Sequence, residues 1–432
     1  MRIWLITIGE PLPTDGPNQR LLRTGILANL LVASGHEVTW WTSSFNHTQK
    51  RFRSDSDNSV FISDRFQIKL LHSIKYSRNI SIRRIVNQYK ISKSFFAQAE
   101  LEKNKPDIIM SSLPTIELAV EACRFGKKNG LPVIIDVRDL WPDVFVELAP
   151  SWMSFFAKLI LKPMFDGVQN ACSNATAIIG ITSNYVDWGL RYAQREKSVF
   201  DRYFSLGYPS IEPDEGAVKD AEDFWKEHGL SKNKDQFVAC FFGTLGRQFE
   251  LETVITAARK LQNEPLKFVI CGEGDRLLTY KKYAGNCKNI IFPGWIGAAQ
   301  IWTLMRISSI GLAPYQNTKN FKANLPNKCI EYLSAGLPIV SSLSGVLEDL
   351  LCKHKCGINY NGSDADQLAS ILFYLYKNQE VLNEMSINAY KLYQKDFVAE
   401  KVYGDMIHYL EAVCSHYKER EFRDDSKLLA NN

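Results

Sequence analysis

The chain has 432 residues, which is more than one hydrophobic core ordinarily serves, so we expect two domains. With 45% hydrophobic and 23% charged residues, both domains can bury ordinary globular cores. The net charge of +5 is mild, and overall charge therefore gives no indication of nucleic acid as a partner. No apolar run approaches the roughly 18 residues that a bilayer-spanning helix needs.

The N-terminus and the cysteines indicate a cytoplasmic protein. The chain starts directly with a strand-like run, RIWLITI, and lacks the charged-then-apolar layout of a signal peptide. Nine cysteines lie scattered along the chain, and the spacing of Cys352 and Cys356 around His354 fits neither a zinc knuckle nor a redox pair. We therefore expect buried, reduced thiols and no metal site.

The first half of the chain alternates short apolar runs with helical patterns. The first of these patterns ends on Gly35, in the position where a left-handed glycine closes a helix. Such alternation is typical of a parallel sheet covered by helices on both faces. The expected strands are 2–8, 37–43, 67–73, 107–112, 132–137 and 177–182.

The same rhythm restarts after a stretch near residues 205–220 that is rich in glycine, proline and acids, which we expect to be a linker. From about residue 379 to 417 the pattern is helical and free of strands. The expected strands of this second half are 237–243, 266–272, 289–295, 309–315 and 337–342.

The fold class that follows is α/β, with two Rossmann-like doubly wound domains facing a cleft. We expect an N-terminal domain at 1–205, a second domain at 206–378, and C-terminal helices at 379–432 that pack back across the domains and end in a polar tail. Ligands of such folds sit beyond the carboxyl ends of the strands, so the loops there are the candidates for chemistry.

Two loops of the first domain carry candidate polar groups. The first, GEPLPTDGPNQR, is long, with Gly16 near its tip and Arg20 at the start of the helix, and loops of this kind usually contribute to a site. The second, PVIIDVRDLWPDVF, is dense in charge, and its members serve either as catalytic polar groups or as ion-paired struts at the end of the sheet. Beside Trp141 they are Asp136, Arg138, Asp139 and Asp143.

A glycine-containing turn in the second domain, FFGTLGRQFEL, connects a strand to a helix. Gly243 and Gly246 allow close approach of the backbone to a ligand, and the following helix N-terminus favours an anion. Arg247 adds a charge that grips phosphate at two points, although an ordinary turn with a solvated arginine remains the alternative. The next such stretch, FVICGEGDR, has G-x-G without a third glycine, which counts against a nicotinamide-dependent dehydrogenase.

The segment KANLPNKCIEYLSAGLPIVSS places a carboxylate, Glu331, among apolar residues. Its pattern predicts a short helix between Pro326 and Gly336, followed by a buried strand. Lys328, near the start of this helix, adds a positive charge close to the carboxylate. Glu331 either acts as an acid favoured by the helix dipole or accepts hydrogen bonds from two neighbouring sugar hydroxyls.

At this point the chain resembles a known family. The motifs FFGTLGR, VICGEGD, IFPGWI, GLAPY and PNKCIEYLSAGLPIVSS follow in the order and spacing of the C-terminal domain of retaining glycosyltransferases of family 4, which have the GT-B fold. The front half resembles the O-antigen and capsule amino-sugar transferases of that family through GHEVTWWTSSFNH and DVRDLWPD. The resemblance covers nearly the whole chain.

The resemblance implies roles for individual residues. Glu331 anchors the donor ribose, Arg247 and Lys328 stabilise the diphosphate, and Asp139 is the catalytic polar group of the first domain, oriented by Asp136 and Arg138. Further donor-nucleotide contacts are Gly16, Gly243, Gly246, Glu273, Trp295 and Ile296, and the donor-sugar contacts are Asn324 and Leu325. The sequence departs from the family pattern at three places: Ala323 replaces the first of two glutamates, Asn324-Leu325-Pro326 replaces Gly-Phe-Gly, and Thr253 replaces a lysine.

The implied activity is transfer of a sugar, expected to be an N-acetylated amino sugar, from a nucleotide-diphosphate donor with retention of configuration. The expected donor is a UDP-sugar, and the expected acceptor is linked to a polyprenyl diphosphate or is a polysaccharide of the cell surface. The resemblance implies neither a cofactor nor a metal. The alternatives are a nucleotide-sugar 2-epimerase of the same fold and a non-catalytic nucleotide-sugar-binding protein.

A basic stretch and an aromatic stretch together predict contact with an anionic membrane. Residues 65–99 contain eight basic residues and no acid, and residues 151–165 form an aromatic and aliphatic stripe. A solvated basic face and an ordinary core helix are the alternatives. We expect a peripheral protein on the inner face of the plasma membrane, with contacts through Arg78, Arg83, Arg84 and Lys90.

Overall fold

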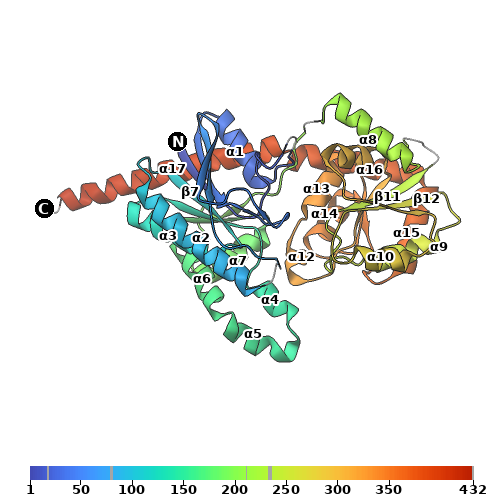
Figure 1. Cartoon of the computed structure of the whole chain (residues 1–432), viewed down its shortest axis with the longest axis horizontal. Helices are drawn as coiled ribbons and strands as arrows, with labels where there is room; N and C mark the ends of the chain where they lie inside the picture. Colours follow the sequence, from blue (N-terminus) through green and yellow to red (C-terminus); the bar gives the residue numbers. More distant parts are fainter. Residues whose placement is uncertain (17–18, 78–80, 211, 232–235, 431–432) are drawn as a thin grey trace. The chain divides into compact units, whose positions relative to one another are not determined.

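The computed structural model describes residues 1–16, 19–77, 81–210, 212–231 and 236–430. The chain divides into two compact units (Figure 1), the first made of Met1–Ser205 and Val402–Asn432 and the second of Leu206–Lys401. The helical segment expected from residue 379 onward is thus shared: its first part lies in the second unit, and residues from Val402 onward return to the first.

The first unit contains an eight-stranded sheet in the order β10-β9-β8-β7-β1-β2-β6-β5. All neighbours are parallel except β5, which is antiparallel to β6 at one edge. Every strand predicted for this half forms, whereas β5, β10 and the two short strands of a separate hairpin were not predicted. The strands are β1 (Arg2–Ile6), β2 (Glu37–Ser43), β3 (Phe45–Asn46), β4 (Arg51–Phe52), β5 (Asn58–Ser63), β6 (Phe66–Leu71), β7 (Ile108–Leu113), β8 (Val133–Val137), β9 (Ala177–Gly180) and β10 (Arg202–Tyr203).

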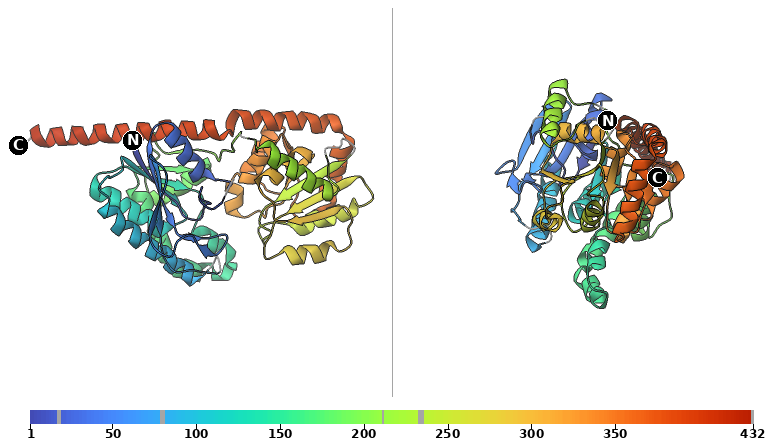
Figure 2. Two further views of the ribbon diagram at one scale, coloured as in Figure 1. Left: turned by 45° about the horizontal axis from the view of Figure 1, so that its top comes forward. Right: turned by 90° about the vertical axis from the view of Figure 1, so that its right-hand side faces the viewer.

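Helices cover both faces of the first sheet (Figures 1 and 2). On one face α2, α3 and α6 pack side by side, and on the other lie α1 and the first unit's part of α17, where Lys418 of α17 pairs with Asp107 at 2.7 Å. The helices are α1 (Arg23–Ala33), α2 (Ile82–Leu101), α3 (Ile116–Asn129), α4 (Asp143–Leu148), the short 3-10 helix η1 (Ser151–Met153), α5 (Ser154–Ile160), α6 (Lys162–Asn174), α7 (Ser183–Ala193) and α17 (Ala399–Ala430).

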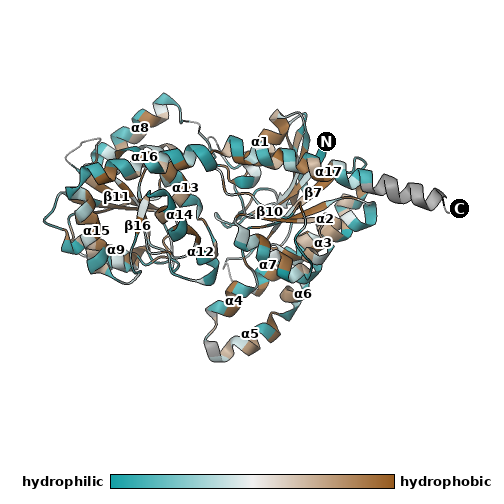
Figure 3. Ribbon diagram, turned by 180° about the vertical axis from the view of Figure 1, so that it is seen from behind, coloured by the Kyte–Doolittle hydropathy of each residue, from teal (hydrophilic) through white to brown (hydrophobic). Residues whose placement is uncertain are grey.

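Aromatic side chains join the first sheet to α2 and α3. Trp4 of β1 stacks on Phe125 with ring centroids 5.3 Å apart, and Trp41 of β2 meets Phe95 edge to face at 5.2 Å. Gly35 closes α1 with a φ of 87°, as predicted. In Figure 3 the strands around β7 and β11 are drawn mostly in brown, as expected of parallel sheets buried on both faces.

The second unit contains a six-stranded parallel sheet in the order β13-β12-β11-β14-β15-β16. Every strand predicted for this half forms, and only β16 was not predicted. Its strands are β11 (Phe237–Phe242), β12 (Leu266–Cys271), β13 (Ile290–Gly294), β14 (Ile310–Ala313), β15 (Ile339–Ser341) and β16 (Gly357–Asn359). Its helices are α8 (Glu215–Glu227), α9 (Leu251–Lys260), α10 (Leu277–Ala284), α11 (Ala298–Ile307), α12 (Lys319–Ala323), α13 (Asn327–Ser334), α14 (Val346–His354), α15 (Ala365–Lys377) and α16 (Gln379–Asp396).

The cysteines are free, and all but Cys287 and Cys352 are buried, as expected for reduced thiols in apolar surroundings. Over the part of the chain that the structure describes, no three metal-ligating side chains come together. Among the described helices, none is both long and apolar enough to cross a membrane.

Candidate functional site

The strand order of the second unit marks one place at its carboxyl edge. The chain runs from β11 outward through β12 to β13 and then returns to the other side of β11 with β14. The loops that follow β11 and β14 therefore diverge, and in open parallel sheets this switch point is where ligands bind. The candidate site is accordingly built from the loops after β11, β12 and β14 together with α13.

The glycines of the loops after β11 and β12 are required by close backbone contact. A Cβ on Gly272, where φ is +129°, would lie 1.9 Å from the carbonyl oxygen of Gly243. A Cβ on Gly274, where φ is +159°, would lie 2.3 Å from the carbonyl oxygen of Leu245. The Leu245 N–H also donates to the Glu273 carbonyl at 2.8 Å. The G-x-G pattern thus fastens one loop to the other and fixes the position of the turn at Gly243.

Lys328 lies in the first turn of α13, and its ammonium group sits beside this glycine turn. A Cβ built on Gly243 would be 3.2 Å from Lys328 Nζ. The same Nζ lies 3.5 Å from the ring centroid of Phe241 and 4.1 Å from that of Phe249. These rings attract the ammonium group through cation–π interaction, and the residue is only 7% exposed. The arrangement suits an anion placed at the turn.

The helix that carries Lys328 and Glu331 begins and ends as its sequence predicts. Pro326, with φ near −66°, stands immediately before the helix, where its missing N–H costs no hydrogen bond. At the other end Gly336 adopts a φ of +68°, which closes the helix in the left-handed conformation. The prediction of a short helix between these two residues is confirmed.

Glu331 lies on the buried face of α13 and is 2% exposed. Burial raises the pKa values of Tyr315 and Tyr332 well above normal, and the charge of Glu331 adds to both shifts. The Tyr332 hydroxyl donates to the carbonyls of Cys240 in β11 and Leu312 in β14, which fixes α13 over the switch point. Glu331 is therefore a buried carboxylate held at the place where the two loops diverge.

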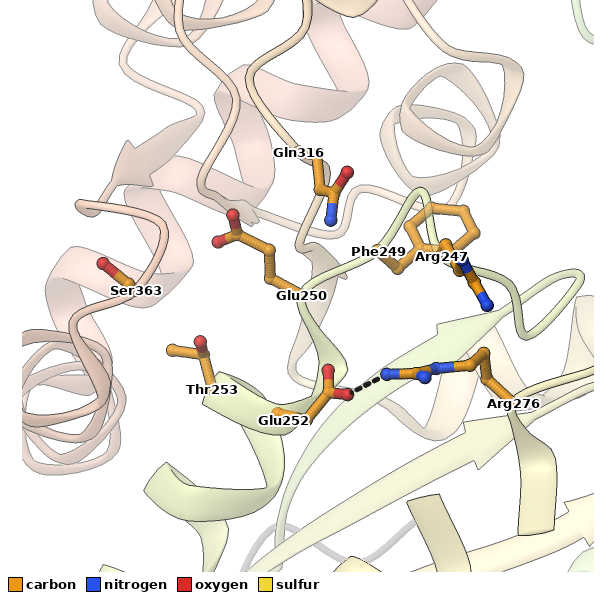
Figure 4. A pocket seen from close by; sticks show the side chains of 8 residues that line it. All are labelled: Arg247, Phe249, Glu250, Glu252, Thr253, Arg276, Gln316 and Ser363. Carbon is orange, nitrogen blue, oxygen red and sulfur yellow. Dashed lines mark hydrogen bonds and ion pairs between the residues drawn. The ribbon is translucent and has the colours of Figure 1, made fainter. Parts of the chain in front are cut away.

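A cavity of about 600 Å³ opens beside these loops (Figure 4). Glu252 and Arg276 form an ion pair at 2.8 Å along one wall. Burial raises the pKa of the Glu250 carboxyl, and the neighbouring Glu252 raises it further. Lys328 and Glu331 are not part of this lining. The lining residues are Arg247, Phe249, Glu250, Glu252, Thr253, Arg276, Gln316 and Ser363.

The other residues predicted to contact a donor lie at the same edge with different exposures. Trp295, after β13, is 66% exposed, while its neighbour Ile296 is buried. Glu273 is exposed, and Asn324 is partly buried between α12 and α13. Leu325 is 5% exposed and packs in the hydrophobic core, so only its backbone can face a sugar.

In the first unit, the predicted charged cluster forms an ion-pair network at the carboxyl end of β8. Asp136 is fully buried, and its carboxylate accepts hydrogen bonds from Arg23 Nε at 3.1 Å and Arg138 Nε at 2.6 Å. The Arg138 guanidinium also pairs with Glu10. Arg23 donates in addition to the carbonyl of Phe204 at 2.9 Å.

This network corrects part of the prediction for the charged cluster. Asp136 and Arg138 were expected to orient Asp139, but their charged groups are directed to Arg23 and Glu10, which makes them the ion-paired struts of the alternative interpretation. Asp139 itself is partly buried, and its Oδ1 accepts from the N–H of Leu140 at 2.9 Å.

The structure also locates three further residues of the first unit that the sequence singled out. Asp143 accepts hydrogen bonds from Trp188 Nε1 at 2.9 Å and from the Tyr192 hydroxyl at 2.7 Å, which is a structural role. Arg20 precedes α1 and does not begin it, because the helix starts at Arg23. Gly16 lies in the described part of the first loop and is partly buried.

Glu10 and Arg23 belong to the network and were missed by sequence analysis. Glu10 accepts from the Thr24 N–H at 3.0 Å and the Thr24 hydroxyl at 2.8 Å, and it is 8% exposed. A charged residue in an otherwise apolar helix such as α1 was the available signal, because a buried arginine requires a carboxylate partner.

Comparison with known proteins finds a family model that matches part of the second unit. Residues 223–392 match glycosyl transferases, group 1. This stretch lies wholly within the second unit and contains α13 and the loops described above. The match to the glycosyl transferases thus falls on the part of the chain in which Gly243, Lys328 and Glu331 come together.

A curated relative and several solved structures are similar over longer stretches. The chain is 23% identical over 275 residues to a putative colanic acid biosynthesis glycosyl transferase, WcaI, of Escherichia coli K12, covering 60% of this chain and 64% of that protein. It therefore spans less than two thirds of the relative's length.

The likeness to solved structures shows the fold class, the GT-B fold with two Rossmann-like domains. Sucrose-phosphate synthase from Thermosynechococcus elongatus superposes with a TM-score of 0.72 at 15% identity, covering 96% of this chain and 99% of that one. Trehalose 6-phosphate synthase from Burkholderia multivorans superposes with a TM-score of 0.67 at 10% identity and 97% and 98% coverage. HepE from Anabaena, in complex with UDP-glucose, superposes with a TM-score of 0.63 at 12% identity, covering 95% of this chain and 100% of that one.

Proposed function

We propose that the protein is a glycosyltransferase that moves a sugar, an N-acetylated amino sugar, from a UDP-sugar to a lipid-linked or polysaccharide acceptor with retention of configuration. The observation that carries the proposal is the ammonium group of Lys328 beside the Gly243 turn, with Glu331 one turn further along the same helix at the switch point. The match to glycosyl transferases and the name of the colanic acid relative support it.

In this proposal the second unit binds the donor. The Glu331 carboxylate accepts hydrogen bonds from the two ribose hydroxyls, and the diphosphate lies at the Gly243 turn against Lys328. Arg247, which is exposed at the cavity, approaches the same diphosphate from the other side. Trp295 and the backbone of Ile296 face the base, and Asn324 faces the sugar. HepE is a protein of the same fold that has been seen with UDP-glucose.

The chemistry follows from where charge grows. As the bond between sugar and diphosphate breaks, negative charge accumulates on the leaving diphosphate, and the fixed cations Lys328 and Arg247 stabilise it more strongly than in the bound donor. The acceptor oxygen bonds to the anomeric carbon on the face that the diphosphate leaves, and the hydroxyl proton passes to an oxygen of the departing diphosphate. Asp139 is the polar group that we assign to the first unit's side of this reaction.

The first test is donor binding with and without the Glu331 charge. We expect a UDP-sugar to bind, and Glu331→Gln to weaken UDP about 10- to 100-fold, since a hydrogen bond to a charged group contributes roughly 1.5–3 kcal/mol. Calorimetric titration measures the affinity, and a melting curve shows whether the variant is folded. Glu348→Gln, on the exposed first turn of α14, is the matched control and should bind UDP normally.

Two outcomes would count against the assignment. Equal UDP affinity in Glu331→Gln and the parent protein would show that Glu331 does not bind the ribose. Conversion of the donor sugar without any acceptor would indicate an epimerase. With an acceptor present, the anomeric configuration of the product, read by NMR, distinguishes retention from inversion.

The second test separates catalysis from binding. Lys328→Met and Arg247→Ala should each lower the single-turnover rate at saturating donor by roughly 100-fold, because they act on charge that grows toward the transition state. Donor affinity should change much less. Lys322→Met, an exposed lysine on α12, is the control. A rise in KM alone would mean that these cations serve only to bind the donor.

A further inference from the structure

A short hairpin of the first unit exposes its apolar side chains. It comprises α4, η1 and α5 and projects from the unit (Figures 1 and 3). None of the seven residues of α5 is buried. By contrast, the next helix, α6, buries Val168, Ala171 and Cys172 against the rest of the unit. The exposed apolar residues of the hairpin, from 38% for Met153 to 76% for Trp152 and Ile160, are Trp152, Met153, Phe155, Phe156, Leu159 and Ile160.

A second apolar stripe lies on α2. This helix buries one face in the unit, through Ile91 and Phe95 among others, yet its opposite face is apolar too. Because their spacing is i, i+3, i+4 and i+7, the exposed residues form one stripe along the N-terminal half of the helix. They are Ile82, Ile85, Val86 and Tyr89, with exposures from 37% to 79%.

The two stripes belong to neighbouring parts of the first unit. The guanidinium of Arg84, in the first turn of α2, lies 4.5 Å from the ring centroid of Trp141, which immediately precedes the hairpin. This contact corrects the membrane prediction for Arg84. Burial lowers the pKa of Arg84, while the carboxylates of Asp139 and Glu117 act in the opposite direction, so its charge serves the interior of the unit and not its surface. Arg78 lies outside the described residues.

The charged groups of α5 and of the N-terminal half of α2 are positive, whereas the acids of the hairpin, Asp143 and Glu147, lie on α4. Arg83 and Lys90 are exposed on α2, and Lys158 is exposed on α5. No acid occurs from residue 65 to 99 or from 149 to 165. Lys69 and Lys93 do not count toward this surface, because Glu102 and Glu121 neutralise them.

We propose that α5, η1 and the exposed stripe of α2, together the docking surface, insert into the headgroup layer of an anionic lipid bilayer. Aromatic and aliphatic side chains with adjacent cations match such a layer, which offers apolar depth below a negative surface. A second copy of the chain fits less well. A symmetric dimer through this surface would bring Arg83, Lys90 and Lys158 against their own copies, with no acid in these segments to compensate.

The docking surface also bears on the acceptor. Both parts of this surface, the stripe of α2 and the hairpin, come after strands and so lie toward the carboxyl edge of the sheet. The helix α2 follows β6, and the hairpin follows β8 and Asp139. An acceptor carried by a membrane lipid would arrive at this edge when the hairpin is inserted. This choice of a lipid-linked over a soluble polysaccharide acceptor rests on the proposed glycosyl transfer, whereas membrane binding itself does not.

The test is sedimentation of the full chain with vesicles of phosphatidylcholine, with and without phosphatidylglycerol. We expect binding to the anionic vesicles only, part of it released by salt. Phe155→Gln/Leu159→Gln/Ile160→Gln should weaken binding at least tenfold and remove the salt-resistant part. Arg83→Glu/Lys90→Glu should remove the salt-sensitive part.

Matched controls separate the surface from general exposure. Leu101→Gln/Leu278→Gln changes two leucines of 81% exposure elsewhere, and Lys281→Glu/Lys282→Glu changes two exposed lysines of α10. Both should sediment like the parent protein.

Three results would overturn the proposal: equal binding to neutral vesicles, unchanged binding of the docking-surface variants, or a dimer in velocity sedimentation that the same variants abolish. The docking-surface substitutions should leave UDP binding unchanged. A protein that binds vesicles but no UDP-sugar would overturn the proposed function and leave the docking surface standing.

Discussion

Asp136→Asn should destabilise the first unit by about 3 kcal/mol or more, because it removes one partner of a buried ion pair. The wild-type network balances two cations, Arg23 and Arg138, with two anions, Asp136 and Glu10. The variant keeps the size of the side chain but leaves two guanidinium groups with the single charge of Glu10. Arg23 is only 3% exposed, so water cannot replace the lost carboxylate.

The measurement must follow the units separately, because a protein with two units need not unfold in one transition. Hydrogen exchange in peptides from β8 and β9 reports on the first unit, and β11 and β12 report on the second. Asp166→Asn is the control, since it breaks an exposed pair with Lys162 that contributes at most about 1 kcal/mol. If Asp136→Asn lowers the free energy of unfolding of the first unit no more than the control does, the network does not stabilise this edge of the sheet.

The ion pairs of Asp136 also predict that the stability of the first unit depends on pH. Burial by itself raises the pKa of the Asp136 carboxyl, but the charges of Arg138 and Arg23 and their hydrogen bonds outweigh it, and the pKa is lowered. A lowered pKa in the folded state means that the stabilisation is complete above the unfolded value, about 3.9, and is lost as the pH falls below it. The difference in stability between the parent protein and Asp136→Asn should therefore shrink as the pH falls below about 4.

Gly272→Ala should disturb the second unit and the donor site together. The new Cβ would lie 1.9 Å from the Gly243 carbonyl oxygen, so either β12 or the Gly243 turn must move. The backbone conformation, with φ at +129°, adds roughly 1–3 kcal/mol of strain for any residue with a side chain. We expect the second unit to lose about 3 kcal/mol of stability. UDP affinity should also fall clearly, because the turn beside Lys328 is displaced.

Gly297→Ala is the matched control for this prediction. Its Cβ would meet nothing closer than Gln300 Oε1 at 3.7 Å, and its φ is negative. It should therefore leave stability and UDP affinity nearly unchanged. Hydrogen exchange of β11 and β12, with calorimetric titration of UDP, checks both variants. A stable Gly272→Ala with normal affinity would mean that the two loops separate without consequence for the site.

The sequence was sufficient to predict the regular part of both sheets. Strands such as β9 and β11 are continuous apolar runs between helical patterns, and this signal is local. The elements that were missed lack it. β5 is largely exposed and antiparallel at an edge, and β16 has only three residues. β5 is held only by β6, to which a tight turn joins it, and β16 is held only by β15, which it reaches through α14.

The candidate sites divide in the same way. The helix with Glu331 was predicted because Pro326 and Gly336 mark its ends locally. The partners of Asp136 were not, because Arg23 lies 113 residues away and comes beside it only through the strand order. The role of Gly272 was also out of reach, since a G-x-G pattern does not reveal which carbonyl approaches it.

The chain passes between the two units twice, once after Ser205 and once after Lys401. The segments next to these crossings are bound to each other: the Tyr208 N–H donates to the Phe397 carbonyl at 2.9 Å, and the Ala399 N–H donates to the Tyr208 carbonyl at 3.0 Å. A protease that cuts one crossing therefore leaves the units tethered by the other. New termini placed at a single crossing, as in a circular permutant, would likewise keep both units in one molecule.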